Sequence, residues 1–415
     1  MVRTLPARLP NPAPIGHHRS GKLGHDVRVR GLYIVAAVTM AGVSSVFALL
    51  AEIEKAYDIP QSQLGWIAGS AFVGALVTQL WLARYADRGH ATRLLRAGVI
   101  ASALGLVWFG LATELWQFVL ARTLLGAGVG MIIPPARRYI VVTSPERQGE
   151  LLGTFYGAYL AGFVFGPPFA GALVVLVDLR TPFIVLGAAT AATMYSLRSV
   201  HIPGAEERSN SRGVLRRLIT TKRMMAALLV VLSFRYSVGV FEPLWSPHLD
   251  RLGASTLTVT LSLTVFALPM LLVARAAGSL TDRYGSRITS LLSALATVPL
   301  MASYGFIGAV PVLFAMAIPH GLMEAVQSPG SQAAVGEAAP PDDAAAAQGL
   351  GEAAGSVAAM LGAMTAPPLY VWLGPGPAWM IAGLVMLILL GTSQVLDPVK
   401  VRRASPSSDQ PTGHS

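Results

Sequence analysis

Twelve apolar segments, most of them close to twenty residues long, follow one another along this sequence of 415 residues. A helix needs about 20 mostly apolar residues to cross the hydrocarbon core of a bilayer. Only 13% of the residues are charged, whereas a soluble globular protein carries roughly 25%. The sequence therefore predicts an all-α membrane protein with twelve transmembrane helices. The predicted spans are 31–51, 64–84, 94–112, 115–135, 151–176, 182–200, 224–245, 256–280, 288–308, 310–334, 349–373 and 376–396.

Basic residues are distributed unevenly among the loops that join these segments. With the N-terminus inside, 25 Lys and Arg residues lie in the tails and inner loops, against 3 in the outer loops. Basic loops stay in the cytoplasm. We therefore expect a multi-pass protein of the plasma (inner) membrane with both termini cytoplasmic. The formal charge of +10 is then explained by loops that face the cytoplasm and anionic lipid, and no nucleic-acid partner is expected.

The two halves of the sequence repeat each other. The Asp87-Arg88 pair recurs as Asp282-Arg283, and Pro167-Pro168 recurs as Pro367-Pro368. Membrane transporters are commonly built from such repeats, with the substrate site at their interface. The predicted organisation is a cytoplasmic basic tail (1–30), a six-helix bundle (31–200), a cytoplasmic linker (201–223), a second six-helix bundle (224–396) and a cytoplasmic tail (397–415).

Short motifs in both halves resemble signatures of the major facilitator superfamily, especially of its drug/proton antiporters. The loop after the eighth segment resembles G-x-x-x-D-R-x-G-R-R, and the loop after the second segment is a weaker copy without the glycines. Similar elements in the fourth and fifth segments read R-x-x-x-G-x-G and G-x-x-x-G-P. The matching residues are Gly278, Asp282, Arg283, Gly285 and Arg287; Asp87, Arg88 and Arg93; Arg122, Gly126 and Gly128; and Gly162, Gly166 and Pro167.

The resemblance implies the fold and mechanism of that superfamily: two six-helix repeats that rock around a central site. In such a fold the paired Asp-Arg loops occupy equivalent cytoplasmic positions, where ion pairs can hold one conformation closed. We therefore expect a conformational gate at Asp87, Arg88, Arg93, Asp282, Arg283 and Arg287. The alternative is that these loops only anchor the protein at the lipid surface. The glycines and Pro167 are expected to pack helices, and the resemblance places Arg122 in the cavity, where it would assist proton coupling; helix packing is its alternative role.

Ionisable residues inside a span are costly and usually face a cavity or a partner. Arg235 lies nearest the middle of its span, and Glu242 follows seven residues later, too far along the helix to pair with it. Glu242 precedes Pro243, so a position at the outer membrane interface is as plausible as one in the cavity.

The tenth segment contains PHGLMEAVQ, in which His320, Glu324 and Gln327 lie on one helical face. A carboxylate removed from water takes up a proton more readily, and histidine titrates near neutral pH. We expect Glu324 to carry the coupling proton and His320 to modulate it. The alternatives are a structural ion pair with Arg235 or a side chain that extends toward the lipid surface. Tyr156 and Tyr159 are added as candidate cavity residues, although core packing would also explain them.

Several other functions find no support. The chain has no Cys, and its 8 His residues lack a zinc-binding spacing, so no metal or cofactor is expected. The phosphate-loop-like GHHRSGKL lacks the final Ser or Thr, so no ATP binding is expected. The sequence predicts a secondary active transporter and not an enzyme, with proton-coupled export of small organic compounds first. An uptake symporter or facilitator is the second reading, and a membrane receptor without transport activity is the third.

Overall fold

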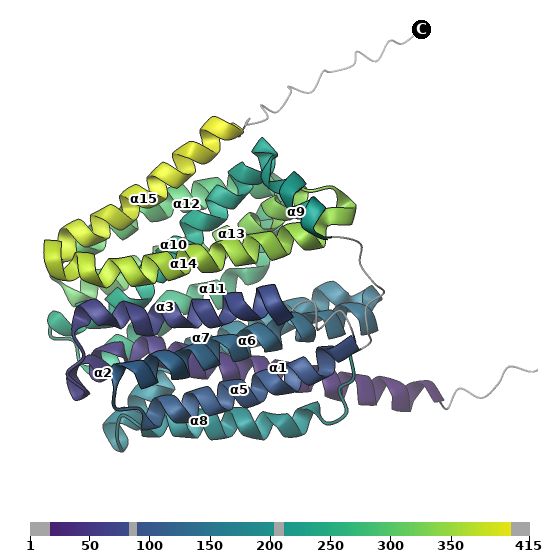
Figure 1. The fold of residues 1–415 in the computed structure, drawn as a ribbon, viewed down its shortest axis with the longest axis horizontal. Helices are drawn as coiled ribbons and strands as arrows, with labels where there is room; N and C mark the ends of the chain where they lie inside the picture. The colour runs from purple at the N-terminus through teal and green to yellow at the C-terminus, as the bar shows by residue number, and fades with distance from the viewer. Residues whose placement is uncertain (1–16, 83–88, 203–210, 400–415) are drawn as a thin grey trace, which may run out of the picture.

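The computed structural model describes residues 17–82, 89–202 and 211–399, and nearly all of them are helical, with no strand in these ranges (Figure 1). The first half contains α1 (His17–Ala48), α2 (Leu50–Ala56), α3 (Leu64–Val77), α5 (Ala91–Leu111), α6 (Leu115–Thr143), α7 (Gln148–Leu176) and α8 (Thr181–Ala192). The second half contains α9 (Ser211–Ile219), α10 (Lys222–Arg251), α11 (Thr256–Tyr284), α12 (Ser286–Ser303), α13 (Val310–Glu337), α14 (Ala344–Leu373) and α15 (Pro375–Leu396). Short helical turns extend several of these, among them η2 (Thr78–Leu82), η5 (Thr193–Leu197) and η7 (Pro341–Asp343).

The apolar segments expected from the sequence become these helices. Eleven of them are long and apolar enough to cross a membrane, and the segment at Thr181–Leu197 is a shorter apolar helix. α1 begins at His17, inside the region expected to be a tail. Gly285 separates α11 from α12 with a φ of 89°, a backbone conformation that glycine adopts without strain. This requirement explains the glycine that follows Asp282-Arg283.

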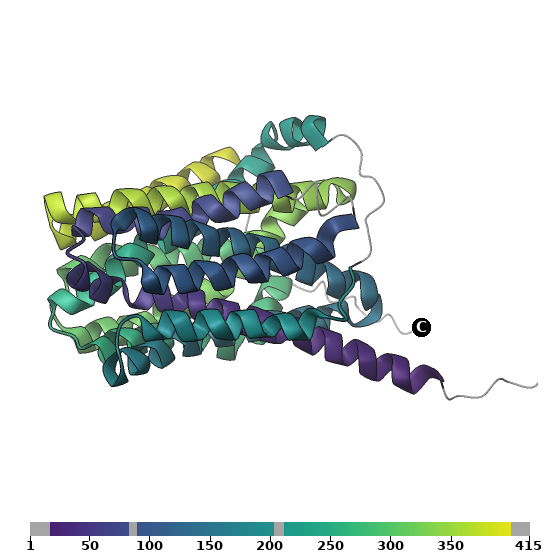
Figure 2. The ribbon, with the colours of Figure 1, turned by 60° about the horizontal axis from the view of Figure 1, so that its bottom comes forward.

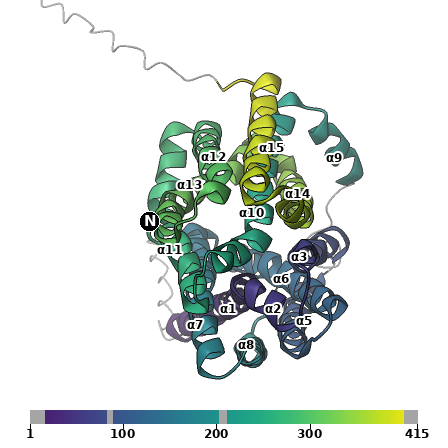
Figure 3. The same ribbon diagram turned by 90° about the vertical axis from the view of Figure 1, so that its left-hand side faces the viewer.

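The membrane helices form two bundles, seen end-on in Figure 3. We call α1, α3 and α5–α8 the N-terminal bundle, and α10–α15 the C-terminal bundle. Along the seam between them, α3 packs against α14 and α7 packs against α11. Loops and helix ends lie at the two ends of the bundles (Figures 1 and 2). We call the end with α2 and the turn at 252–255 the α2 end, and the end with α9 the linker end.

Among the described residues, the apolar core joins the two bundles toward the α2 end. The largest core cluster contains residues of both bundles, and the ring of Phe47 packs edge-on against Phe241 across the seam with centroids 5.9 Å apart. Toward the linker end, separate clusters form within each bundle, around Leu32 and Tyr139 in one and around Met224 in the other. The fold is therefore asymmetric, and its bundles are bound most extensively at the α2 end.

Candidate functional site

A buried ion pair joins the bundles where α6 faces α10. The guanidinium of Arg122 donates a hydrogen bond to the carboxylate of Glu242, and a second one, of 3.2 Å, to the backbone carbonyl of Val43 on α1. Arg122 is only 1% exposed and Glu242 8%. The structure places Glu242 inside the protein and not at the lipid interface. This pair holds three helices together, two from one bundle and one from the other.

Polar contacts on the α2 side of this pair also cross the seam. Lys55 on α2 pairs with Asp250 on α10, and the hydroxyl of Thr256 donates to Glu52 over 2.6 Å. The hydrogen bond to Asp250 raises the pKa of Lys55, and burial raises the pKa of the neighbouring Glu54. Toward the linker end, polar contacts between the bundles are fewer among the described residues: a long hydrogen bond of 3.5 Å from Ser356 to Gln79, and a contact of Tyr156 with Ser328. The polar contacts thus repeat the asymmetry of the apolar core.

The face of α13 predicted from the sequence lies inside the C-terminal bundle. His320 is completely buried, and its Nε2 lies 3.4 Å from the carboxylate of Glu324. Its Nδ1 forms a 2.8 Å hydrogen bond with the hydroxyl of Tyr304. Within the described part of the chain, Glu324 forms no ion pair with Arg235. The buried amide of Gln327 has no hydrogen-bond partner among the described residues.

The other candidate cavity residues line the seam. On α7, the rings of Tyr156 and Tyr159 stack with centroids 5.8 Å apart and planes only 10° from parallel. Tyr156 lies beside Ser328 of α13 and close to Glu324. The guanidinium of Arg235 lies 5.8 Å from the ring centroid of Phe72 on α3. These contacts bring the two tyrosines and Arg235 together with residues of the opposite bundle, on the linker side of the Arg122–Glu242 pair.

Among the predicted gate residues that the structure describes, none is joined to another by an ion pair. Asp87 and Arg88 lie outside the described residues. Arg93 and Asp282 are exposed, and Asp282 forms no ion pair with any described residue. Arg283 lies over the ring of Tyr284, 5.3 Å from its centroid.

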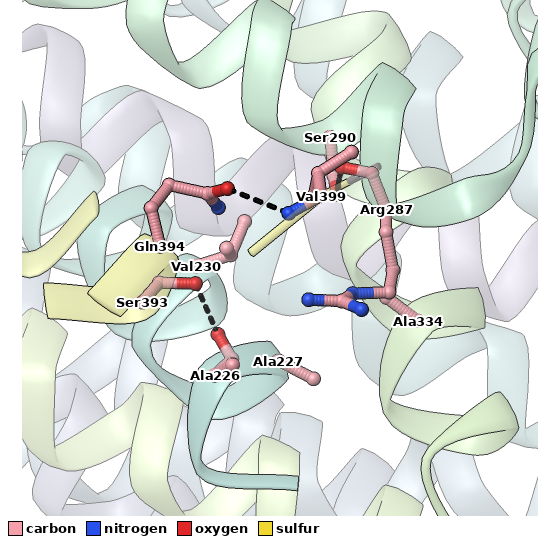
Figure 4. A pocket seen from close by; sticks show the side chains of 9 residues that line it. All are labelled: Ala226, Ala227, Val230, Arg287, Ser290, Ala334, Ser393, Gln394 and Val399. Carbon is pink, nitrogen blue, oxygen red and sulfur yellow. Dashed lines mark hydrogen bonds between the residues drawn. The ribbon is translucent and has the colours of Figure 1, made fainter. Parts of the chain in front are cut away.

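Arg287 has a partner that the sequence did not indicate. It pairs with Asp397, just after the last helix, over 2.8 Å. The guanidinium borders a pocket of about 10 Å³, which holds at most one water (Figure 4). Nearby, Gln394 accepts a hydrogen bond from the backbone N–H of Val399. Arg287 therefore fastens the end of α15 to α12. The pocket is lined by Ala226, Ala227, Val230, Arg287, Ser290, Ala334, Ser393, Gln394 and Val399.

Glycines of the fourth and fifth segments lie where helices approach most closely. A Cβ on Gly126 would stand 2.1 Å from the carbonyl oxygen of Ala71 on α3, and one on Gly162 would stand 2.0 Å from that of Ala37 on α1. Gly128 faces a side chain of α5 and Gly166 faces the backbone of α1, while Pro167 is buried in α7. Small residues at such positions let membrane helices pack backbone to backbone. This close packing fixes α6, and with it Arg122, against its neighbours.

Comparison with known families now decides the identity of this fold. The model of the Major Facilitator Superfamily matches the chain twice, over residues 32–245 and 227–414. The chain belongs to the major facilitator superfamily. It is therefore an integral, multi-pass membrane protein of a transporter family, as the resemblance of its motifs predicted.

Characterised relatives and solved structures agree with this placement. Multidrug resistance protein 2 of Bacillus subtilis (strain 168) is 22% identical over 225 residues, which are 52% of this chain and 56% of that protein. Multidrug resistance protein MdtG of Escherichia coli O9:H4 (strain HS) is 26% identical over 241 residues, 54% of this chain and 58% of MdtG. The chain thus spans little more than half the length of the curated relatives it matches.

Two solved structures share the fold. An inward-facing, occupied structure of a bacterial homologue of the human lysosomal transporter Spinster gives a TM-score of 0.74 at 15% identity, over 92% of this chain and 99% of that one. The nucleoside transporter NupG gives 0.73 at 14% identity, over 90% and 100%. At such low identity these neighbours establish the fold of the chain and nothing about its substrate.

Proposed function

We propose that this chain is a secondary active transporter that exports small organic compounds in exchange for protons, by alternating access. The observation that carries the proposal is the buried Arg122–Glu242 pair across the seam. A family of transporters that rock one bundle against the other needs contacts that hold one end closed and can be broken. A carboxylate paired with a buried arginine meets that need, because a proton on the carboxyl removes the charge that binds the bundles. Multidrug relatives support export.

In this proposal the α2 end faces the outside of the cell and is the closed end here, so the conformation is inward-facing. The excess of basic residues in the tails and in the 201–223 linker supports this orientation. A reporter that is active only in the cytoplasm should work when it is fused within 201–223 or after Arg403. Activity from a fusion at Gly253, with none from the linker, would reverse the orientation.

Glu324 is the proposed carrier of the coupling proton, with His320 as its modulator. A charged side chain near the centre of a span costs about 2.5–3.5 kcal/mol on translocon scales. Glu324 is buried, and His320 is its ion-pair partner among the described residues. A cycle in which its carboxyl alternates between neutral and charged lowers this cost in one half of the cycle. The proposed substrate site lies in the same region, between Tyr156 and Tyr159 on one side and Gln327 and Arg235 on the other.

Transport in proteoliposomes with an imposed pH gradient tests this assignment. A panel of small organic compounds first identifies a transported one. Glu324→Gln should then abolish accumulation driven by the gradient, while exchange of substrate without a gradient continues. Glu150→Gln is the matched control, because Glu150 is an exposed carboxylate at the linker end and should behave as wild type. Gradient-driven accumulation by Glu324→Gln at the wild-type level would remove Glu324 from the mechanism, and Glu242 would become the candidate carrier. Substrate and protons that move in the same direction would indicate the uptake symporter.

A further inference from the structure

The short helix α9, between the two bundles, has no role in the mechanism described so far. It covers nine residues, Ser211–Ile219, and a two-residue turn separates it from α10. It lies at the periphery of the C-terminal bundle, beside α14, and not between the bundles (Figures 2 and 3). One side of it therefore faces away from the protein, close to the linker end of the membrane helices.

Only some of the apolar residues of α9 pack against the rest of the protein. Leu218 is buried and, with Val214, contacts the core of the C-terminal bundle. Leu215 and Ile219 are also one helical turn apart, but their side chains are 40% and 46% exposed. Leu215 and Ile219 thus form an exposed apolar pair, next to the side of the helix that packs against the bundle.

The charged residues of α9 and of the first turn of α10 are all positive. The segment 211–223 contains five Lys and Arg residues and no Asp or Glu. Arg216, Lys222 and Arg223 are exposed. Arg217 is exposed as well, but its guanidinium pairs with the buried carboxylate of Asp343, just before α14. The ion pair and Leu218 fasten the helix to the protein, which leaves the other basic residues beside the exposed apolar ones.

We propose that α9 is an interfacial helix that binds a membrane surface rich in anionic phospholipid. A short helix with basic and apolar faces lies in the plane of the interface, with its apolar side chains in the acyl region and its basic groups among the headgroups. Leu215 and Ile219 enter the acyl region, and Arg216, Lys222 and Arg223 bind lipid phosphates. The anchored helix precedes α10 directly, so it ties the position of α10 to the composition of the inner leaflet.

Site-directed spin labelling of the full chain tests the proposal without any transport measurement. The sequence contains no Cys, so Leu215→Cys, Ile219→Cys and Thr220→Cys each give one labelled site. In vesicles made from equal parts of phosphatidylcholine and phosphatidylglycerol, labels at 215 and 219 should be more accessible to oxygen than to a water-soluble nickel chelate. The label at 220, on the exposed polar side, should show the reverse.

Charge removal then separates lipid binding from simple packing. Each basic group near an anionic surface contributes about fivefold to binding. Arg216→Gln/Arg223→Gln should therefore lower the ratio of inserted to water-exposed label at 215 by about 25-fold. Arg28→Gln, which removes an exposed arginine from α1 in the other bundle, should leave the ratio unchanged. The same loss should follow when phosphatidylcholine replaces phosphatidylglycerol.

Two outcomes would overturn the proposal. Equal access of the nickel chelate to positions 215 and 220 in phosphatidylglycerol vesicles would place α9 in water. Spin–spin broadening at 215 that disappears on dilution with unlabelled protein would show that a second copy of the chain covers this face. The labels report folding as well, because a helix that has come loose gives mobile spectra at all three sites, in either kind of vesicle.

Discussion

Removal of one charge from the Arg122–Glu242 pair should open the α2 end of the molecule. In Glu242→Gln, the guanidinium of Arg122 keeps the carbonyl of Val43 as a hydrogen-bond partner but loses its counter-charge. In Arg122→Gln, the carboxylate of Glu242 stays buried without a cation. Either variant penalises the closed seam, whereas separation of the bundles lets water reach the remaining charge. The perturbation therefore acts on the balance between conformations and less on folding.

The size of the shift follows from burial. The side chain of Arg122 is 2% exposed and that of Glu242 11%, so solvent screens the pair little. Removal of one member of a buried pair costs about 3–5 kcal/mol, because the other charge is left unpaired. With about 1.4 kcal/mol for each factor of ten, the closed form should become about 100- to 4,000-fold less favoured relative to the open form. The double variant Arg122→Gln/Glu242→Gln leaves no unpaired charge and should shift the balance far less than either single variant.

Distances between paired spin labels measure this balance. Labels at Ala56 and Leu257, both exposed at the α2 end, should give a short, narrow distance distribution in the wild type and a longer one in each single variant. Labels at Gln148 and Asp342, exposed at the linker end, should report the opposite movement. Lys55→Gln is the matched control. It also removes an ion pair across the seam, with Asp250, but the lysine side chain of that pair is exposed, and exposed ion pairs contribute at most about 1 kcal/mol.

One result would refute this reasoning. If both single variants keep the wild-type distances at the α2 end, and their thermal unfolding midpoints are also unchanged, the pair does not hold the seam. A double variant that opens as far as the single variants would show that the effect comes from lost packing and not from an unpaired charge.

Three further predictions concern other parts of the molecule. Gly162→Ala should destabilise the protein by about 1–3 kcal/mol, because its Cβ would stand 2.0 Å from the Ala37 carbonyl oxygen, whereas Gly157→Ala, which meets open space, should not. Thermal unfolding in detergent compares the two variants, and equal losses of stability would contradict close packing at Gly162. Asp282→Asn should leave the closed α2 end unchanged but slow its interconversion with the other state, as followed by spin-label distances over time; an unchanged rate would reduce this loop to a lipid anchor. Burial raises the pKa of Glu54, so the folded protein binds a proton more tightly than the unfolded chain, and stability falls as pH rises from the ordinary Glu pKa to the raised one. Glu54→Gln should abolish this fall in the unfolding midpoint, and a fall that persists in the variant would belong to another group.

The sequence predicted the class of this fold because the constraint is strong and local. A bilayer dictates the length of each helix and the charge of each loop, so apolar runs and basic loops can be read without knowledge of packing. The short segment at Thr181–Leu197 was predicted from the same pattern. The start of α1 was less predictable, because the residues from His17 onward are polar and basic and extend the helix beyond its apolar part.

The candidate site could be predicted only in part. Individual residues such as Arg122, Glu242 and Glu324 attract notice because charge inside a span is costly. Their partners depend on how two bundles meet, and sequence spacing gives no information about that. Glu242 pairs with a residue 120 positions away, and the partner of Arg287 follows the last helix. Tyr304, which binds His320, lies in no motif of the sequence.

Glu242 and Glu324 differ in what a proton on each can accomplish. A proton on Glu242 removes half of a charge pair that connects the bundles, so it acts directly on the closed end. A proton on Glu324 acts within one bundle, where its neighbour is His320, and moves no contact across the seam by itself. For Glu324 to couple protons to rocking, its charge must be sensed from the opposite bundle, and Tyr156 of that bundle lies near it. Tyr156→Phe should then weaken coupling while Glu242–Arg122 still closes the α2 end, which separates the carrier of the proton from the contact that closes the transporter.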